Sequence, residues 1–208
     1  MPITNERIVW IDCEMTGLDL EKDALIEVAA LVTDSELNIL GEGVDVVIKP
    51  EDAALEQMND FVRDMHTRSK LLDELPHGKT MAEAEALILE YIEAWVPDPK
   101  KAPLGGNSVG TDRTFLVRDM PNVIEHLHYR VIDVSTIKEL SRRWFPRAYF
   151  QAPAKHGGHR ALGDIKDSID ELRYYREAVF VPAPGPDTAT AQKVSKRISG
   201  SVGNSTTV

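Results

Sequence analysis

The segment 8–12, IVWID, constrains the fold most strongly, because it is a short and almost uniformly apolar run that ends in a carboxylate. Such a run is typical of a central β-strand buried on both faces, since a half-exposed strand would alternate apolar and polar residues. Two more strand-like segments follow at 24–33 and 43–48, with Gly41 and Gly43 marking a turn. The early part of the chain therefore predicts a sheet with residues 8–12 near its centre.

Helix-like and strand-like patterns alternate in the chain that follows. Residues 80–95 predict a helix, because Thr80 and Glu83 form a capping box and apolar residues then recur at helical spacing. The remaining expected elements are strands at 102–107 and 130–134 and helices that begin near Thr111, at a Ser135/Thr136 cap and near Arg160. Three early strands followed by strands that alternate with helices indicate an α/β fold with a mixed sheet.

Charge and composition narrow the possible partners. The chain has 34 acidic and 24 basic residues and a net charge of -10, which argues against tracking a long nucleic acid or an anionic membrane. The net negative charge is still compatible with a small anionic substrate that is held by metal ions. A single cysteine, Cys13, excludes an intrachain disulfide framework and a multi-cysteine metal site. We see no membrane-spanning run and no signal peptide, so we expect a cytoplasmic protein without a membrane partner.

The composition changes after Phe180. Residues 182–208 are rich in Pro, Gly, Ser, Thr and Ala and contain three basic residues and one acidic residue. Because such a segment buries too little apolar surface to offset its conformational entropy, we expect a disordered tail. The expected organisation is one domain over residues 1–181, which carry a net charge of -12 once the tail's +2 is removed, followed by the tail at 182–208.

Four carboxylates stand where an α/β sheet places its ligands. Asp12 and Glu14 follow the first strand, and their spacing puts both on one face if the strand continues. Asp112 and Asp164 lie near helix starts. Taken singly, each acid has an ordinary explanation, as a solvated strand end or as a helix cap. Together they predict an all-oxygen site for Mg²⁺ or Mn²⁺, with His159 as a general base, an arrangement suited to two-metal hydrolysis of a phosphodiester.

Three segments that contain these residues resemble the exonuclease motifs of the DEDDh 3′→5′ exonucleases. They are IDCEMTGLD (11–19), GGNSVGTDRTFLVRDMP (105–121) and HRALGDI (159–165). Segments 65–72, 128–140 and 170–176 are similar to the branch of that family that degrades very short RNA. The resemblance covers residues 5–180. It implies an RNase H-like mixed five-stranded sheet flanked by helices, a homodimer, two divalent metal ions (Mg²⁺ or Mn²⁺), and short single-stranded RNA, including linear dinucleotides, as the substrate.

The resemblance also implies a role for each matching residue. Asp12, Glu14, Asp112 and Asp164 would bind the metal ions, and His159 would be the general base. The implied substrate contacts are Leu18 as a wedge between bases, Phe61 as a stacking ring, His66, a cap for the 5′ phosphate made by Ser108, Arg130, Ser135 and Thr136, and Tyr129 from the partner subunit. Many relatives have tryptophan at the position of Phe61. Without the resemblance, Leu18 would be interpreted as packing inward and His66 as a surface residue.

Two alternatives remain at the level of sequence. The chain could be another DEDDh exonuclease, such as a DNA-proofreading subunit or a ribonuclease T, although segment 128–140 and the absence of basic patches argue against this. It could also be an inactive nucleotide-binding module on the same fold. The presence of all five polar site residues disfavours this second alternative.

Overall fold

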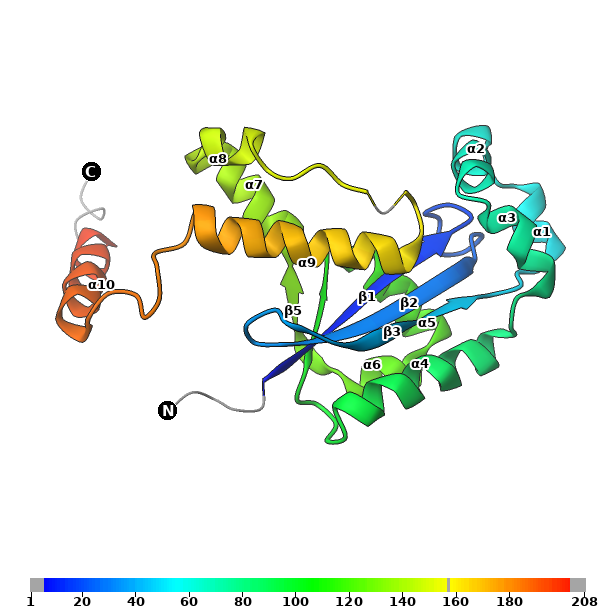
Figure 1. Cartoon of the computed structure of the whole chain (residues 1–208), viewed down its shortest axis with the longest axis horizontal. Helices are drawn as coiled ribbons and strands as arrows, with labels where there is room; N and C mark the ends of the chain where they lie inside the picture. Colours follow the sequence, from blue (N-terminus) through cyan, green and yellow to red (C-terminus); the bar gives the residue numbers. More distant parts are fainter. Residues whose placement is uncertain (1–5, 157, 203–208) are drawn as a thin grey trace.

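A mixed five-stranded sheet forms the centre of the molecule (Figure 1). The computed structural model describes residues 6–156 and 158–202. The strands lie in the order β3-β2-β1-β4-β5; β1, β2 and β3 pair antiparallel, whereas β4 pairs parallel with both β1 and β5. Their bounds are Arg7–Met15 (β1), Leu25–Asp34 (β2), Ile39–Val47 (β3), Pro103–Gly106 (β4) and His128–Asp133 (β5). The predicted mixed sheet is confirmed.

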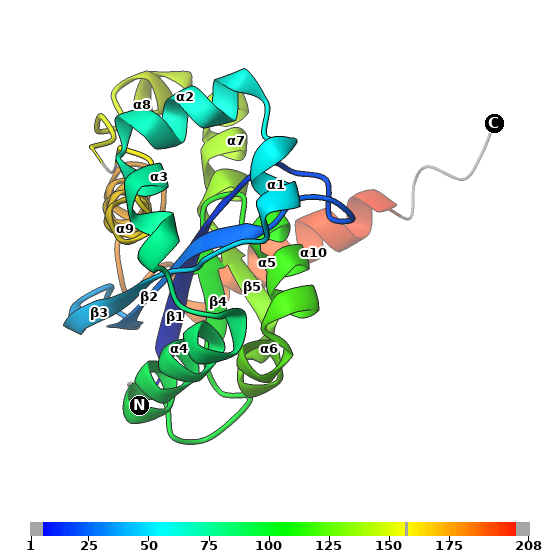
Figure 2. The ribbon, with the colours of Figure 1, turned by 90° about the vertical axis from the view of Figure 1, so that its right-hand side faces the viewer.

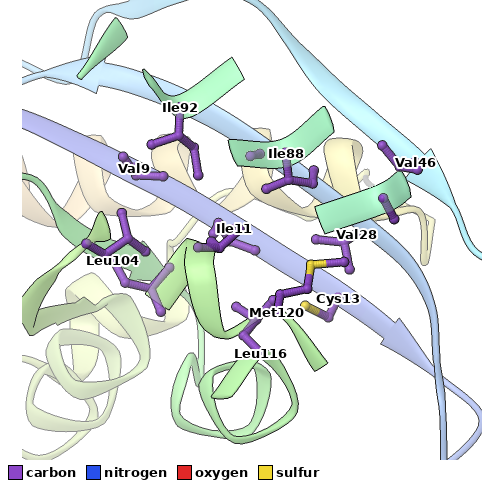
Figure 3. Packing of buried hydrophobic residues seen from close by; sticks show 14 of the residues in the cluster. Val9, Ile11, Cys13, Val28, Val46, Ile88, Ile92, Leu104, Leu116 and Met120 are labelled. Carbon is purple, nitrogen blue, oxygen red and sulfur yellow. The ribbon is translucent and has the colours of Figure 1, made fainter. Parts of the chain in front are cut away.

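Strand β1 is buried on both faces because its side chains alternate between two cores. Val9 and Ile11 point toward helices α4 (Met81–Trp95) and α5 (Gly110–Asp119), as Figure 3 shows. Trp10 points to the opposite face, where it packs with the apolar side of helix α9 (Ala161–Ala178). Each fully buried large side chain contributes about 1.5–3 kcal/mol to stability. The two cores therefore fix the position of β1, which carries the first acids of the predicted site.

Helices cover both faces of the sheet, with α9 on one side and α4, α5 and α6 on the other (Figures 1 and 2). The capping box of Thr80 and Glu83 is present as predicted. Helix α7 (Val134–Trp144) corrects the sequence analysis, because its N-cap is Asp133 and not Ser135 or Thr136. The other helices of the domain are α1 (Asp52–Glu56), α2 (Asp60–Arg68), α3 (Leu71–Glu74), a 3-10 turn (Leu75–His77), α6 (Pro121–His126) and α8 (Pro146–Phe150).

The C-terminal segment differs from the expectation of a structureless tail. Residues Thr188–Val202 form helix α10, which Figure 1 shows apart from the sheet and its flanking helices. Its side chains from 188 to 200 are exposed. The helix is thus not built into either core, and a domain boundary near residue 181 stays a prediction. Among the described residues, no helix combines the length and apolarity needed to cross a bilayer.

Candidate active site

The first two acids of the site come from the carboxyl-terminal half of β1. Asp12 and Glu14 are two residues apart on an extended strand, so their side chains leave the same face. Residue Glu14 is buried, and its cross-strand partner in β2 is another acid, Glu27. The alternative of a solvated strand end is therefore wrong for Glu14.

The other two acids come from the first turns of helices. Asp112 lies in α5, and its Oδ1 accepts a hydrogen bond from the backbone N–H of Cys13, at 3.1 Å. Asp164 lies in the first turn of α9. Ligand atoms of Asp164, Glu14 and His159 all lie within 4.8 Å of one another. His159 precedes α9 in a left-handed backbone conformation (φ 60°), which turns the chain just before the helix.

The pKa of each of the four carboxylates is raised, chiefly by burial, and neighbouring acids of the site add to the effect at Asp12 and Glu14. Burial raises the pKa of Asp12 well above its usual range, and the charges of Asp112, Glu14 and Asp164 add to the effect. Burial, followed by the charge of Asp164, raises the pKa of Glu14 to about 8. Burial likewise raises the pKa of Asp112 to about 6 and increases that of Asp164. A cluster that resists ionisation in this way is stabilised by a cation, and its all-oxygen donor set suits Mg²⁺ or Mn²⁺.

His66 borders the cluster, and the structure buries it completely. Because Nε2 lies 2.9 Å from the carbonyl oxygen of Met15, that nitrogen donates and Nδ1 is the acceptor. Nδ1 is buried without a hydrogen-bond partner among the described residues and lies 3.9 Å from Oε2 of Glu14. Burial lowers the pKa of His66. The interpretation of His66 as a surface residue is wrong, and its unpaired acceptor faces the acidic site.

Three predicted substrate contacts are large apolar or aromatic side chains on the surface. Leu18, Phe61 and Tyr129 are 75%, 74% and 75% exposed. Leu18 follows β1, Phe61 lies in the first turn of α2, and Tyr129 lies on the edge strand β5. The alternative in which Leu18 packs inward is therefore wrong. These side chains are therefore available to bases.

The structure brings together only part of the predicted phosphate cap. The backbone N–H groups of Ser108 and Ser135 donate to the same oxygen, Oδ1 of Asp133, at 3.0 and 2.9 Å. Thr136 follows, exposed, in the first turn of α7. Arg130 instead lines a hollow near the opposite ends of the parallel strands, and its guanidinium carbon lies 5.5 Å from the centre of the Tyr129 ring. Within one chain, Arg130 is thus not grouped with the serines.

Sequence reasoning missed three residues that organise this region. Asp133 holds Ser108 and Ser135, and buried Glu27 forms an ion pair with partly exposed Arg160 beside the acids. One signal was present in the sequence: Glu27 interrupts the apolar segment LIEVAALV, and a buried carboxylate requires a partner. The identity of that partner, 133 residues away, could not be inferred from spacing.

Comparison with known proteins shows the family to which the chain belongs. A family model described as "Exonuclease" matches residues 9–172. The chain is 67% identical over 195 residues to the oligoribonuclease of Streptomyces griseus, covering 94% of this chain and 97% of the relative. It is 59% identical over 193 residues to the oligoribonuclease of Cutibacterium acnes, covering 93% and 96%.

Solved structures show the same fold at much lower sequence identity. The zinc-bound complex of E. coli ExoI with single-stranded DNA superposes with a TM-score of 0.64 at 16% identity, over 83% of this chain and 41% of that chain. Exonuclease I without a ligand gives a TM-score of 0.62, also at 16% identity, over 84% and 43%. This chain therefore spans about two fifths of those larger proteins and corresponds to their exonuclease fold.

Proposed function

This chain belongs to the exonuclease family as a 3′→5′ exoribonuclease of the oligoribonuclease type, and we propose that it completes RNA decay by hydrolysing very short oligomers, dinucleotides included. The products are nucleoside 5′-monophosphates. One observation carries the proposal: four carboxylates from β1, α5 and α9 interact electrostatically in one place, with His159 beside them.

The donor set of the cluster fits a pair of divalent ions. Mg²⁺ or Mn²⁺ would be held by Asp12, Glu14, Asp112 and Asp164. Asp12 would be the central ligand, because the charges of the other three all raise its pKa. Two such ions supply charge that stabilises both the attacking and the leaving oxygen of the phosphodiester. The protein contributes the fixed position of the carboxylates, which come from a doubly buried strand and two helix ends.

His159 is the proposed general base. Its imidazole is exposed at the rim of the cluster and lies close to Glu14 and Asp164. A neutral imidazole there can accept the proton of the attacking water. The left-handed φ of His159 turns the chain just before α9 begins.

The proposed preference for short RNA follows from how the chain would hold its substrate. A net charge of -10 supplies little counterion-release affinity for a polymer. Binding would depend instead on Leu18 and Phe61 at the bases and on Ser108, Ser135 and Thr136 at the 5′ phosphate, near the start of α7. Because such a cap closes the 5′ end, turnover would fall as the substrate lengthens.

A homodimer would complete this site. Tyr129 and Val131 are exposed on edge strand β5, and Trp144, Phe145 and Phe150 are exposed on α7, α8 and the link between them. An unpaired edge with exposed aromatic residues is typical of an interface. Tyr129 and Arg130 are neighbours on that edge, so a second subunit would deliver both to its partner's substrate.

Buried Cys13, the single cysteine, suits the proposed cytoplasmic location.

Product analysis on 5′-labelled RNA tests the proposal. A ribodinucleotide, a ribo-20-mer and a DNA 20-mer are each incubated with Mg²⁺, Mn²⁺ or EDTA. We expect metal-dependent shortening of the labelled strand from its 3′ end, and the fastest conversion to labelled mononucleotide from the ribodinucleotide. Equal turnover of the dinucleotide and the 20-mer would exclude the cap, and preference for the DNA would favour a DNA exonuclease. Activity in EDTA would exclude the metal site.

A further inference from the structure

Glu27 is a fully buried acid next to the candidate active site. It lies on β2 directly opposite Glu14, and paired residues of antiparallel strands project from the same face. Two carboxylates in this relation repel each other, and the charge of Glu27 is one of the causes that raise the pKa of Glu14. A buried acid at this position therefore needs a compensating partner.

Arg160 is that partner, and it joins three parts of the chain. Its Nε donates to Oε1 of Glu27 at 2.7 Å, and its two terminal nitrogens donate to the oxygens of Glu74 at 2.8 and 3.1 Å. A forked contact of this kind fixes the orientation of the guanidinium as well as its place. Strand β2, the end of α3 and the start of α9 are thereby connected.

Glu27 also caps helix α9. Its second oxygen, Oε2, accepts from the backbone N–H of Ala161 at 2.9 Å. That N–H opens α9 and has no acceptor within the helix, and the side chain of Arg160, the N-cap residue, does not provide one. Both oxygens of a sheet residue therefore hold the first turn of α9.

The residues held in this way include two members of the site. His159 directly precedes Arg160, and the backbone N–H of Asp164 donates to the carbonyl oxygen of Arg160 at 3.0 Å. We propose that Glu27 and Arg160 are positioning residues of the exonuclease site: they hold the start of α9 against β2, so that His159 and Asp164 converge on Glu14. This inference rests on the proposed function, although its metal-binding test does not require RNA.

A positioning role can be separated from a folding role. Further along, α9 is held by Ile165 and Ile169, which belong to the buried core against β1 and β2. Loss of the Arg160 contacts should therefore loosen the first turn without releasing the helix. Arg176 offers a matched control. It is also an arginine of α9 that pairs with an acid, Glu36, but this pair lies at the other end of the helix, at the turn between β2 and β3.

The test compares wild type with Arg160→Gln, Arg160→Lys, Glu27→Gln and Arg176→Gln. Hydrolysis of a ribodinucleotide is measured at saturating Mn²⁺, with thermal unfolding recorded in parallel. We expect kcat to fall by about 10–100-fold in Arg160→Gln and Glu27→Gln, the usual loss when an outer partner of a metal ligand is removed. KM should change by less than about threefold, since the proposed base contacts lie elsewhere. Arg160→Lys should be intermediate, and Arg176→Gln should match wild type.

Binding of Mn²⁺, followed by electron paramagnetic resonance without RNA, gives an independent readout. Removing the positive charge of Arg160 would strengthen cation binding if charge alone mattered. We expect the opposite, a loss of about tenfold in Arg160→Gln, because Asp164 is no longer aligned. Unchanged or tighter Mn²⁺ binding together with a wild-type kcat would overturn the inference. Wild type that binds Mn²⁺ but leaves RNA intact would refute the proposed function instead, and the Mn²⁺ comparison would still decide this inference.

Discussion

The two halves of the candidate site are built in opposite ways. The carboxylates are partly or fully buried, stand on a central strand and two helix ends, and have raised pKa values. The proposed base contacts Leu18, Phe61 and Tyr129 are about three quarters exposed. The chemical half is thus preorganised at a cost in stability, whereas the recognition half takes shape only when a substrate or a second subunit covers it.

Replacing Asp12 with asparagine should have the largest effect on activity and the opposite effect on stability. The proposed ions lose their central ligand, so we expect kcat to fall by at least about 10³-fold. Because burial and three neighbouring acids raise the pKa of Asp12, its charge destabilises the metal-free fold. The variant should therefore melt at a higher temperature than wild type in EDTA.

Activity assays and calorimetry on the same preparation check this result. Asp170→Asn, an exposed acid farther along α9, is the control and should change neither quantity. If Asp12→Asn retained more than about a tenth of wild-type kcat, the assignment of Asp12 as a metal ligand would be wrong.

His159→Gln should have the next largest effect. General-base catalysis contributes typically about 10²–10⁴-fold, and glutamine cannot accept the proton of the attacking water. The residue is exposed on a loop, so the melting temperature should stay close to that of wild type. The measurement is kcat against pH, with exposed His156 as the control position. A full rate at pH 7 in His159→Gln would remove the histidine from the mechanism.

The chemical half could be predicted from sequence because its residues are tied to local patterns. Asp12 and Glu14 continue an apolar strand, and Asp164 follows His159 at the start of an obvious helix. Strand alternation and helix caps decide where such residues lie, and both are readable over a few positions. The mixed sheet and the capping box at Thr80 were predictable for the same reason.

Long-range contacts explain what sequence alone could not supply. The sequence of α2 gives no sign that His66 is buried, because its imidazole hydrogen-bonds to the carbonyl oxygen of Met15, 51 residues away. Asp133 caps α7 through a local bond from the N–H of Ser135, whereas its second bond, from the N–H of Ser108, joins residues 25 positions apart and could not be inferred from spacing. Helix α10 is a separate case, because it lies where composition indicated disorder and its side chains from 188 to 200 are exposed, so packing against a core does not account for it.

Phe61 allows a smaller test on the recognition half. Stacking of a base on an aromatic ring contributes about 1–3 kcal/mol, so Phe61→Ala should raise KM for a dinucleotide by about tenfold while kcat changes little. Phe61→Trp offers a larger ring and should lower KM below that of wild type. Steady-state kinetics on both variants check this, with exposed Val117 of α5 as the control for loss of a surface apolar side chain. A change confined to kcat would contradict a stacking role.

The smallest expected effect is a pH-dependent shift in melting temperature that belongs to the chemical half alone. In the folded protein the pKa of Glu14 is raised from 4.5 to about 8 and that of Asp112 from 3.8 to about 6. Folded protein therefore binds more protons than unfolded protein between about pH 4 and pH 8, and the free energy of unfolding falls as pH rises through this window.

Metal ions should reverse that trend, because they replace the protons that keep the cluster neutral. Scanning calorimetry in EDTA and in Mn²⁺ should show stabilisation by the metal of several degrees at pH 8 and much less at pH 5. Glu14→Gln should flatten the EDTA profile, whereas Phe61→Ala should leave it unchanged, since Phe61 carries no charge and is exposed. If the melting temperature of Glu14→Gln in EDTA fell with pH as steeply as that of wild type, the buried cluster would not control the pH dependence of stability. The two halves of the site would then differ in structure but not in how they affect stability.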